Sequence, residues 1–161
     1  MIFEEKIIRL SVYLESNEQC KEYKSLLLKK LKENYEKKAF EKYGIINSVS
    51  SIHKICYEEM MKTNPIIYFL IDTVVETYFP QKEDKIKLEI SKILNYGIFL
   101  ERSSFRVLIP SLPSSYKLEK DNELYYKYED KKIRMGDTIE FIITDVRFEK
   151  AGFHCLAKLI E

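Results

Sequence analysis

Apolar and polar residues alternate along several stretches of this 161-residue chain. Over Ile7–Leu14 the alternation brings four apolar side chains to one face: Ile8, Leu10, Val12 and Leu14. Within the predicted strand Lys85–Ile93, the residues Lys85, Lys87 and Glu89 alternate with Ile86, Leu88 and Ile90. Because successive side chains of a strand point to opposite faces, a period of two predicts half-buried β-strands. We therefore expect sheets with one face in a core and the other in solvent.

Further strands are predicted by the same alternation, or by runs of β-branched and aromatic residues. They cover Ile45–Ile52, Ile66–Tyr78, Gly97–Leu100, Phe105–Ile109, Thr138–Phe148 and Phe153–Ile160. Gly44 and Gly97 supply turns, since glycine tolerates a positive φ. Counting from Lys85, the second half has five short strands and one longer insertion at residues 110–130. That number is typical of an OB-type barrel.

One helix is predicted between the first two strands. Its apolar stripe recurs every three or four residues and comprises Cys20, Tyr23, Leu27, Leu31 and Tyr35. Ser16–Gln19 has the S-x-x-Q form of a capping box at the start of this helix. The expected fold class is α+β, with a small N-terminal α/β domain at residues 1–80 and an OB/S1-like β-barrel at 81–161.

Composition excludes several classes of protein. With 45% hydrophobic residues the chain can bury a core, which excludes wholesale disorder. A net charge of +1 excludes a domain that grips nucleic acid by bulk charge. Three cysteines, odd in number and far apart, form no disulfide framework. No segment approaches the roughly 20 apolar residues of a membrane span. We expect a soluble protein of a reducing compartment, without a membrane partner.

Catalytic and metal-binding motifs are missing from the sequence. The spacing of His53 and Cys56 is H-x-x-C, but no second pair completes the four ligands that a zinc site needs. His154 and Cys155 are adjacent on a predicted strand and point to opposite faces. Phosphate-binding glycine loops and nucleophile elbows are absent as well. The sequence predicts no enzymatic activity, no metal and no cofactor.

Four stretches in order carry a resemblance to a known family. They are Leu31–Ile52 with its K-Y-G-I-I turn, Val74–Pro80, Asn95–Phe99 with a Y-G-I-F turn, and Phe105–Pro110 followed by Ile133–Ile139. In this order the chain resembles the OB-fold stalk proteins of DNA-dependent RNA polymerases, the family of the seventh subunit of eukaryotic RNA polymerase II and of its archaeal counterpart. The bias toward Lys and Ile is consistent with a divergent version from a large DNA virus.

The resemblance implies a non-catalytic polymerase subunit with a truncated RNP-like tip domain before the barrel. Such a subunit docks on the polymerase core through the tip, pairs with a smaller helical stalk protein, and contacts nascent single-stranded RNA weakly through the barrel. The candidate docking residues are Tyr43, Gly44 and Ile45, which lie in the K-Y-G-I-I turn, and Pro65. The implied location is the nucleus for a cellular eukaryotic protein, and the cytoplasm or virion for a viral one.

RNA contact requires aromatic platforms for bases and cations for phosphates. Phe105 and Arg106 are adjacent on a strand, so they face opposite ways, and Phe105 is the better core residue. The remaining candidates on the barrel are Lys85, Lys87, Tyr96, Phe99, Arg102, Arg106, Arg147 and Phe153. Two other interpretations stay open: a stand-alone OB-fold RNA-binding protein without a polymerase, and a structural adaptor whose barrel has lost RNA affinity.

Overall fold

The computed structural model describes residues 2–15, 22–61 and 65–160, and it divides into two compact units. The N-terminal unit is Ile2–Tyr78, and the C-terminal unit begins at Phe79. The predicted capping box at Ser16–Gln19, and Cys20 behind it, lie outside the described residues.

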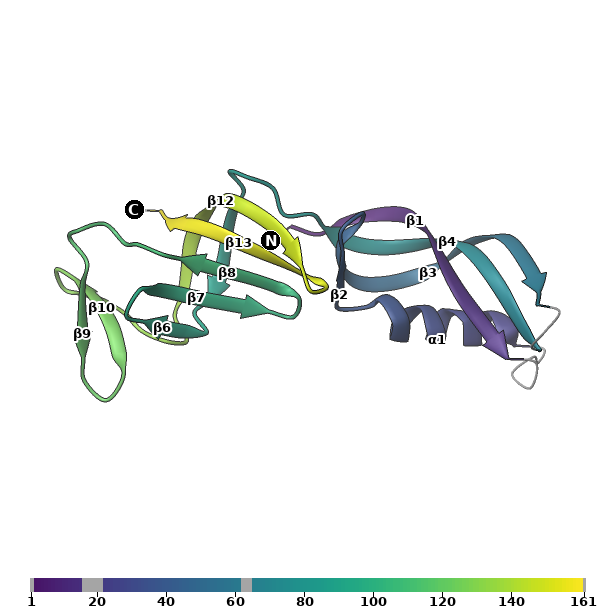
Figure 1. Cartoon of the computed structure of the whole chain (residues 1–161), viewed down its shortest axis with the longest axis horizontal. Helices are drawn as coiled ribbons and strands as arrows, with labels where there is room; N and C mark the ends of the chain where they lie inside the picture. Colours follow the sequence, from purple (N-terminus) through teal and green to yellow (C-terminus); the bar gives the residue numbers. More distant parts are fainter. Residues whose placement is uncertain (1, 16–21, 62–64, 161) are drawn as a thin grey trace. The chain divides into compact units, whose positions relative to one another are not determined.

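The N-terminal unit is a four-stranded antiparallel sheet with one helix on one face (Figure 1). The strand order is β1-β4-β3-β2. The bounds are β1 Glu4–Glu15, α1 Tyr23–Tyr35, β2 Lys38–Phe40, β3 Gly44–Met60 and β4 Ile66–Tyr78. Gly44 begins β3 with a φ of 84°, a conformation that glycine adopts without steric cost.

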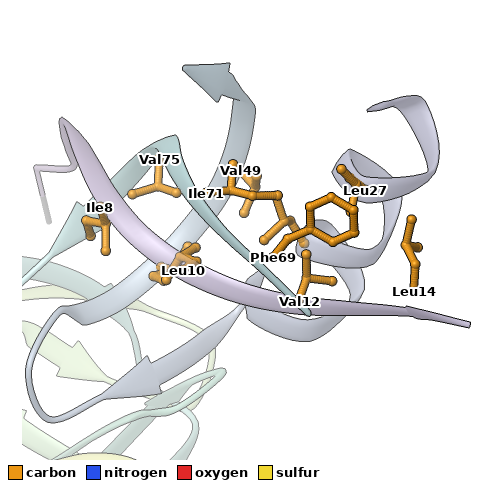
Figure 2. Packing of buried hydrophobic residues seen from close by; sticks show 11 residues of the cluster. Ile8, Leu10, Val12, Leu14, Leu27, Val49, Phe69, Ile71 and Val75 are labelled. Atoms are coloured by element: carbon orange, nitrogen blue, oxygen red, sulfur yellow. The ribbon is translucent and has the colours of Figure 1, made fainter. Parts of the chain in front are cut away.

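The core of this unit lies between α1 and the sheet (Figure 2). Leu27 and Leu31 are fully buried, and the alternation of β1 supplies the facing side chains. The cluster contains Ile8, Leu10, Val12, Leu14, Ile46, Val49, Phe69, Ile71 and Val75 with the two helix leucines. The predicted strand, the face that it buries, and the end of the helix at Tyr35 are confirmed. Within the described ranges of this unit, no helix covers the opposite face of the sheet.

The C-terminal unit is built on a six-stranded sheet of order β5-β12-β13-β8-β7-β6. Its strands are β5 Lys85–Glu89, β6 Lys92–Leu94, β7 Gly97–Arg102, β8 Phe105–Ile109, β12 Thr138–Glu149 and β13 Gly152–Leu159. The pair of β8 and β13 is parallel, and the other pairs are antiparallel. The edge strands β5 and β6 are separated by only two residues of chain, so the sheet curves into a half-barrel.

A second, three-stranded sheet occupies part of the expected insertion at residues 110–130 and extends beyond it to Ile133. Its strands are β9 Lys117–Lys120, β10 Leu124–Tyr128 and β11 Lys131–Ile133, in the order β11-β10-β9. Strand β10 packs near β6, where the Tyr126 hydroxyl donates to the carbonyl oxygen of Leu94 at 3.4 Å. The insertion is therefore a hairpin-based sheet attached to the half-barrel, rather than a loop.

The expected α+β fold class is wrong. The structure is 64% strand and 9% helix, and the described residues contain a single helix. The N-terminal unit is therefore not the expected α/β tip domain. The C-terminal unit, expected to be an OB/S1-like barrel, is a half-barrel. The reason is that strands run on where connections were expected. Cys56–Met60 continues β3, and the insertion at 110–130 folds into strands. Strand Lys85–Ile93 is also interrupted, at Ile90 and Ser91.

Candidate nucleic-acid interface

A cleft of about 440 Å³ lies on the side of the six-stranded sheet that is directed away from the half-barrel core. We call it the outer cleft. Its principal side chains come from β6–β7, β8, β12 and β13: Tyr96, Phe99, Arg106, Leu108, Asp145, Arg147, Glu149, His154 and Leu156. The cleft gathers four of the eight predicted RNA-binding residues, namely Tyr96, Phe99, Arg106 and Arg147.

Strand register aligns an apolar row across the cleft. Phe99 on β7 is paired with Leu108 on β8, and Leu108 is paired with Leu156 on β13. Leu156 is 41% exposed although its neighbours on the strand are buried. Tyr96 lies in the turn before β7 and is 65% exposed. These side chains give the cleft an apolar floor with an accessible aromatic ring at one end.

A charged row runs parallel to the apolar one, further along the same strands. Arg106 on β8 is paired with Glu101 on β7 and with His154 on β13. His154 is in turn paired with Arg147 on β12. Two arginines therefore flank a histidine on neighbouring strands, which are about 5 Å apart.

A β-bulge in β12 decides which side chains enter the cleft. Before the bulge, residues 139, 141 and 143 point into the core, where Phe141 and Ile143 are fully buried. The register shifts between Ile143 and Asp145, so Asp145 is paired with the outward-facing Leu156. A bulge inserts one residue and reverses the alternation beyond it. Without this bulge, Arg147 would point toward the core.

Both arginines of the cleft form ion pairs with exposed carboxylates. Arg106 Nε lies 2.9 Å from Glu101 Oε1, with the two side chains 52% and 41% exposed. Arg147 lies 3.6 Å from Glu149 and both side chains are more exposed still. Exposed ion pairs contribute about 0–1 kcal/mol. A phosphate can therefore replace either carboxylate at low cost, although the acidic groups leave the cleft without a net positive charge.

Cys155 lies beneath the cleft on the core side of β13. Burial, followed by the negative charges of Asp145 and Asp84, raises the pKa of its thiol to about 12. The thiol therefore stays protonated at neutral pH and cannot act as a nucleophile or as a thiolate ligand.

The other predicted RNA-binding residues lie elsewhere. Lys85 and Lys87 point outward from β5 as the alternation predicts, but they do not line the outer cleft. Arg102 ends β7 and lines a different hollow, with Glu89 and Ser91.

Phe153 is 2% exposed and packs edge-on against Phe148 at 5.0 Å and Phe79 at 5.5 Å between ring centroids. Its ring is therefore part of the core and is not available for stacking on a base. Phe105 is fully buried and Arg106 is exposed, which confirms the predicted orientation of this pair.

Sequence reasoning missed four residues of the cleft, Leu108, Asp145, Glu149 and Leu156, and assigned no role to His154. Alternation alone identifies Leu108 and Leu156 as outward-facing, because buried residues flank each of them. No local signal aligns them with Phe99, since that requires the pairing of β8 with β13.

The predicted docking residues do not form one surface. Gly44 and Ile45 are buried, and Tyr43 is half-buried against Phe40 with its hydroxyl directed at the carbonyl oxygen of Arg9. Only Pro65 is exposed. Accessible apolar side chains of this unit, among them Ile7 and Tyr13, instead lie on the sheet face opposite α1, which we call the outer face.

The outer face pairs residues of β1 with those of β4. Ile7 lies opposite Val74, and Tyr13 lies opposite Tyr68 with ring centroids 5.2 Å apart. Ile7 and Tyr13 are each more than half exposed. A surface of this kind, with exposed aromatic and aliphatic side chains on a rigid sheet, fits contact with another protein.

An ion pair lies between these apolar pairs. Arg9 Nε donates to Asp72 Oδ1 at 3.0 Å across β1 and β4. This hydrogen bond, helped by one from Cys56, lowers the pKa of the Asp72 carboxyl below its usual value. The pair is exposed, so its contribution is to fix the charge pattern of the outer face rather than to stabilise the fold.

Metal ligands are not gathered at any point of the described chain. Within residues 2–15, 22–61 and 65–160 no group of three or more His, Cys, Asp or Glu side chains is placed to hold a metal ion. The same ranges contain no helix that is long and apolar enough to cross a membrane.

Comparison with known proteins identifies no family for this chain. No protein-family model matches the sequence, and neither does any curated protein. The function is therefore inferred from the geometry of the outer cleft and from the motif order described above.

Proposed function

We propose that this chain is a non-catalytic stalk subunit of a DNA-dependent RNA polymerase, and that it contacts nascent single-stranded RNA through the outer cleft. The observation that carries the proposal is the pair of parallel rows on β7, β8, β13 and β12. One row offers Phe99 and the neighbouring Tyr96 as platforms for bases, and the other offers Arg106 and Arg147 for phosphates. Single strands are bound by this combination in many proteins.

The charge of the cleft decides what kind of binding to expect. Asp145, Glu149 and Glu101 offset the two arginines, so electrostatic attraction is small. Stacking, worth about 1–3 kcal/mol per base, then supplies most of the affinity. Weak binding suits a subunit that is held beside the transcript by protein contacts, because tethering provides a high effective concentration.

Protein contacts are assigned to the outer face of the N-terminal sheet. Its exposed side chains, Ile7, Tyr13 and Tyr57, are suited to docking on the polymerase core or on a smaller helical stalk protein. The four candidate docking residues Tyr43, Gly44, Ile45 and Pro65 would act mainly by shaping the β2–β3 turn and the start of β4, since two of them are buried.

Two measurements test the proposal. The first is affinity capture of the tagged chain from its native source, where the large polymerase subunits are expected among the co-purifying proteins. Recovery of the chain with RNA but without those subunits would favour a stand-alone RNA-binding protein instead.

The second measurement is binding of a short unstructured RNA to the full chain. Tyr96→Ala should weaken binding about 5- to 150-fold, the equivalent of one lost stacking contact. Arg106→Ala with Arg147→Ala should lower the slope of log affinity against log salt by about 1.4, since each phosphate contact on a single strand contributes about 0.7. Lys85→Ala with Lys87→Ala removes the same charge outside the cleft and should change neither value. If wild-type and cleft variants bind equally, or not at all, the adaptor interpretation is preferred.

A further inference from the structure

The three-stranded sheet of the insertion has two faces of different character. Leu118, Tyr126 and Ile133 are paired across β9, β10 and β11 on one face, and Tyr126 bonds to Leu94 of β6. This inner face covers part of the half-barrel. By alternation, residues 117, 127 and 132 point to the opposite, outer side. In Figure 1 the β9–β10 hairpin projects from the six-stranded sheet.

Three lysines stand in one row across the outer side. Lys127 of β10 is paired with Lys117 of β9 and with Lys132 of β11, and all three are exposed. We call these residues the lysine row. Like charges directly opposite each other on neighbouring strands are destabilising. In the described ranges none of the three forms an ion pair with a carboxylate within 4.0 Å.

Packing holds one end of the row in place. The Lys132 ammonium lies 5.3 Å from the centroid of the Tyr125 ring, and the Arg134 guanidinium lies 4.7 Å from the same centroid. Cation–π contacts of this length orient the cations before any ligand arrives. The hydroxyl of Tyr125 donates to Glu119 Oε2 at 2.9 Å, which engages one of the carboxylates on this side. Glu119 and Glu129 still line the hollow of about 250 Å³ beside Lys117 and Lys127.

We propose that the lysine row binds successive phosphates of the same RNA strand whose bases stack in the outer cleft. The inference rests on the proposed function and adds the phosphate contacts that the charge-balanced cleft lacks. Continuity supports it, because β10 is bonded to Leu94, a residue that lines the cleft. A strand that leaves the cleft past β6 would cross the edge of the three-stranded sheet to reach the lysine row, which lies on the side opposite Tyr126.

The test measures binding of the full chain to oligouridine of about 6 and about 20 nucleotides, lengths that bracket the site size of one small β-domain. The variant replaces Lys117, Lys127 and Lys132 by Gln. For the long RNA, the salt slope should fall by about 2 and the affinity at 0.1 M salt on the order of 100-fold, since each lost contact removes about 0.7 from the slope. For the short RNA, which reaches only the cleft, affinity should be unchanged.

A matched control replaces Lys24, Lys29 and Lys32 on the exposed side of α1 by Gln and so reaches the same net charge. It should leave both affinities unchanged. Glu129→Gln removes a carboxylate beside the row and should strengthen binding of the long RNA about fivefold. The lysine variant should melt no lower than wild type, because it removes repulsion.

The proposal is overturned if the lysine variant keeps the wild-type salt slope, or if the α1 control loses as much affinity. Those outcomes do not contradict RNA binding by the outer cleft or the proposed function, provided that Tyr96→Ala still weakens binding of the short RNA. The converse result is that Tyr96→Ala leaves binding unchanged while the lysine variant loses affinity for the long RNA. That result would support phosphate binding by the lysine row and would contradict base stacking in the outer cleft.

Discussion

Replacement of Gly97 by alanine should destabilise the C-terminal unit and disrupt the outer cleft. Gly97 begins β7 with a φ of 150°, in a region that residues with a side chain rarely adopt. A Cβ at this position would overlap the carbonyl oxygen of Ile109 and lie 3.0 Å from its carbonyl carbon. Both atoms belong to the backbone of the neighbouring strand β8, so neither can rotate away.

The cost has two parts. A strained φ costs on the order of 1–3 kcal/mol, and overpacking against rigid atoms adds about 1–3 kcal/mol. We therefore expect the free energy of unfolding of this unit to fall by about 2–6 kcal/mol. The matched variant is Gly136→Ala, whose φ is 94° but whose Cβ would meet only the end of the Glu89 side chain at 3.9 Å. It should lose about 1–2 kcal/mol from the backbone alone.

Amide hydrogen exchange of the full chain measures the loss of stability separately for each of the two units. In Gly97→Ala the protection of β12 and β13 should fall about 30-fold or more, since 1.4 kcal/mol corresponds to a factor of ten. Protection of β1 and β4 should not change, which makes the N-terminal unit an internal reference. RNA binding should fall with it, because Tyr96 and Phe99 flank the displaced strand start. Equal protection in the Gly97 and Gly136 variants would refute the steric argument.

Three further predictions concern the core, the ion pair and the buried thiol. Leu31→Ala should lower the free energy of unfolding of the N-terminal unit by about 2–5 kcal/mol, and the half-buried Leu28→Ala by less, as read from exchange in β4. Arg9→Met should raise the pKa of Asp72 in a carbon-detected NMR titration. An unchanged Asp72 pKa in this variant would contradict the assigned cause. Because the pKa of Asp72 is depressed in the folded wild type, its contribution to stability is present above the ordinary carboxyl pKa. That contribution disappears as the pH falls through the pKa of the folded state. With the other two cysteines replaced by serine, Cys155 should react with a disulfide reagent at pH 8 only after urea is added, and rapid labelling of the folded protein would disprove its burial.

Local pattern was sufficient for most of the strands. The period of two in β1 identified both the strand and its buried face, and the apolar run after Pro65 identified β4 from Ile66 to Tyr78. These segments succeed because each buries one face in a single core. Strand β9 failed because all four of its residues are exposed, so it carries no burial signal. Its pairing with β10 depends on contacts outside its own sequence.

Four of the nine residues named for the outer cleft could be predicted, and the reason why the others could not is geometric. Tyr96 and Arg106 were identified from residue type and strand position. The alignment of Arg147 with His154 depends on the bulge between Ile143 and Asp145, which no local pattern marks. A shift of one residue would exchange core and cleft residues, so site prediction from sequence was limited by register rather than by chemistry.

Because β8 pairs with β13, the six-stranded sheet can be completed during synthesis only after Gly152–Leu159 has been made. The N-terminal sheet is complete once Tyr78 has left the ribosome, whereas β5 waits for β12 and β8 waits for the final strand, β13. Non-local pairing of this kind folds slowly, and the edge of β8 stays unpaired on the nascent chain until the end. Premature termination before Gly152 would remove the strand that joins β8 to β12 and split the six-stranded sheet in two. During synthesis the outer face is thus formed before the outer cleft.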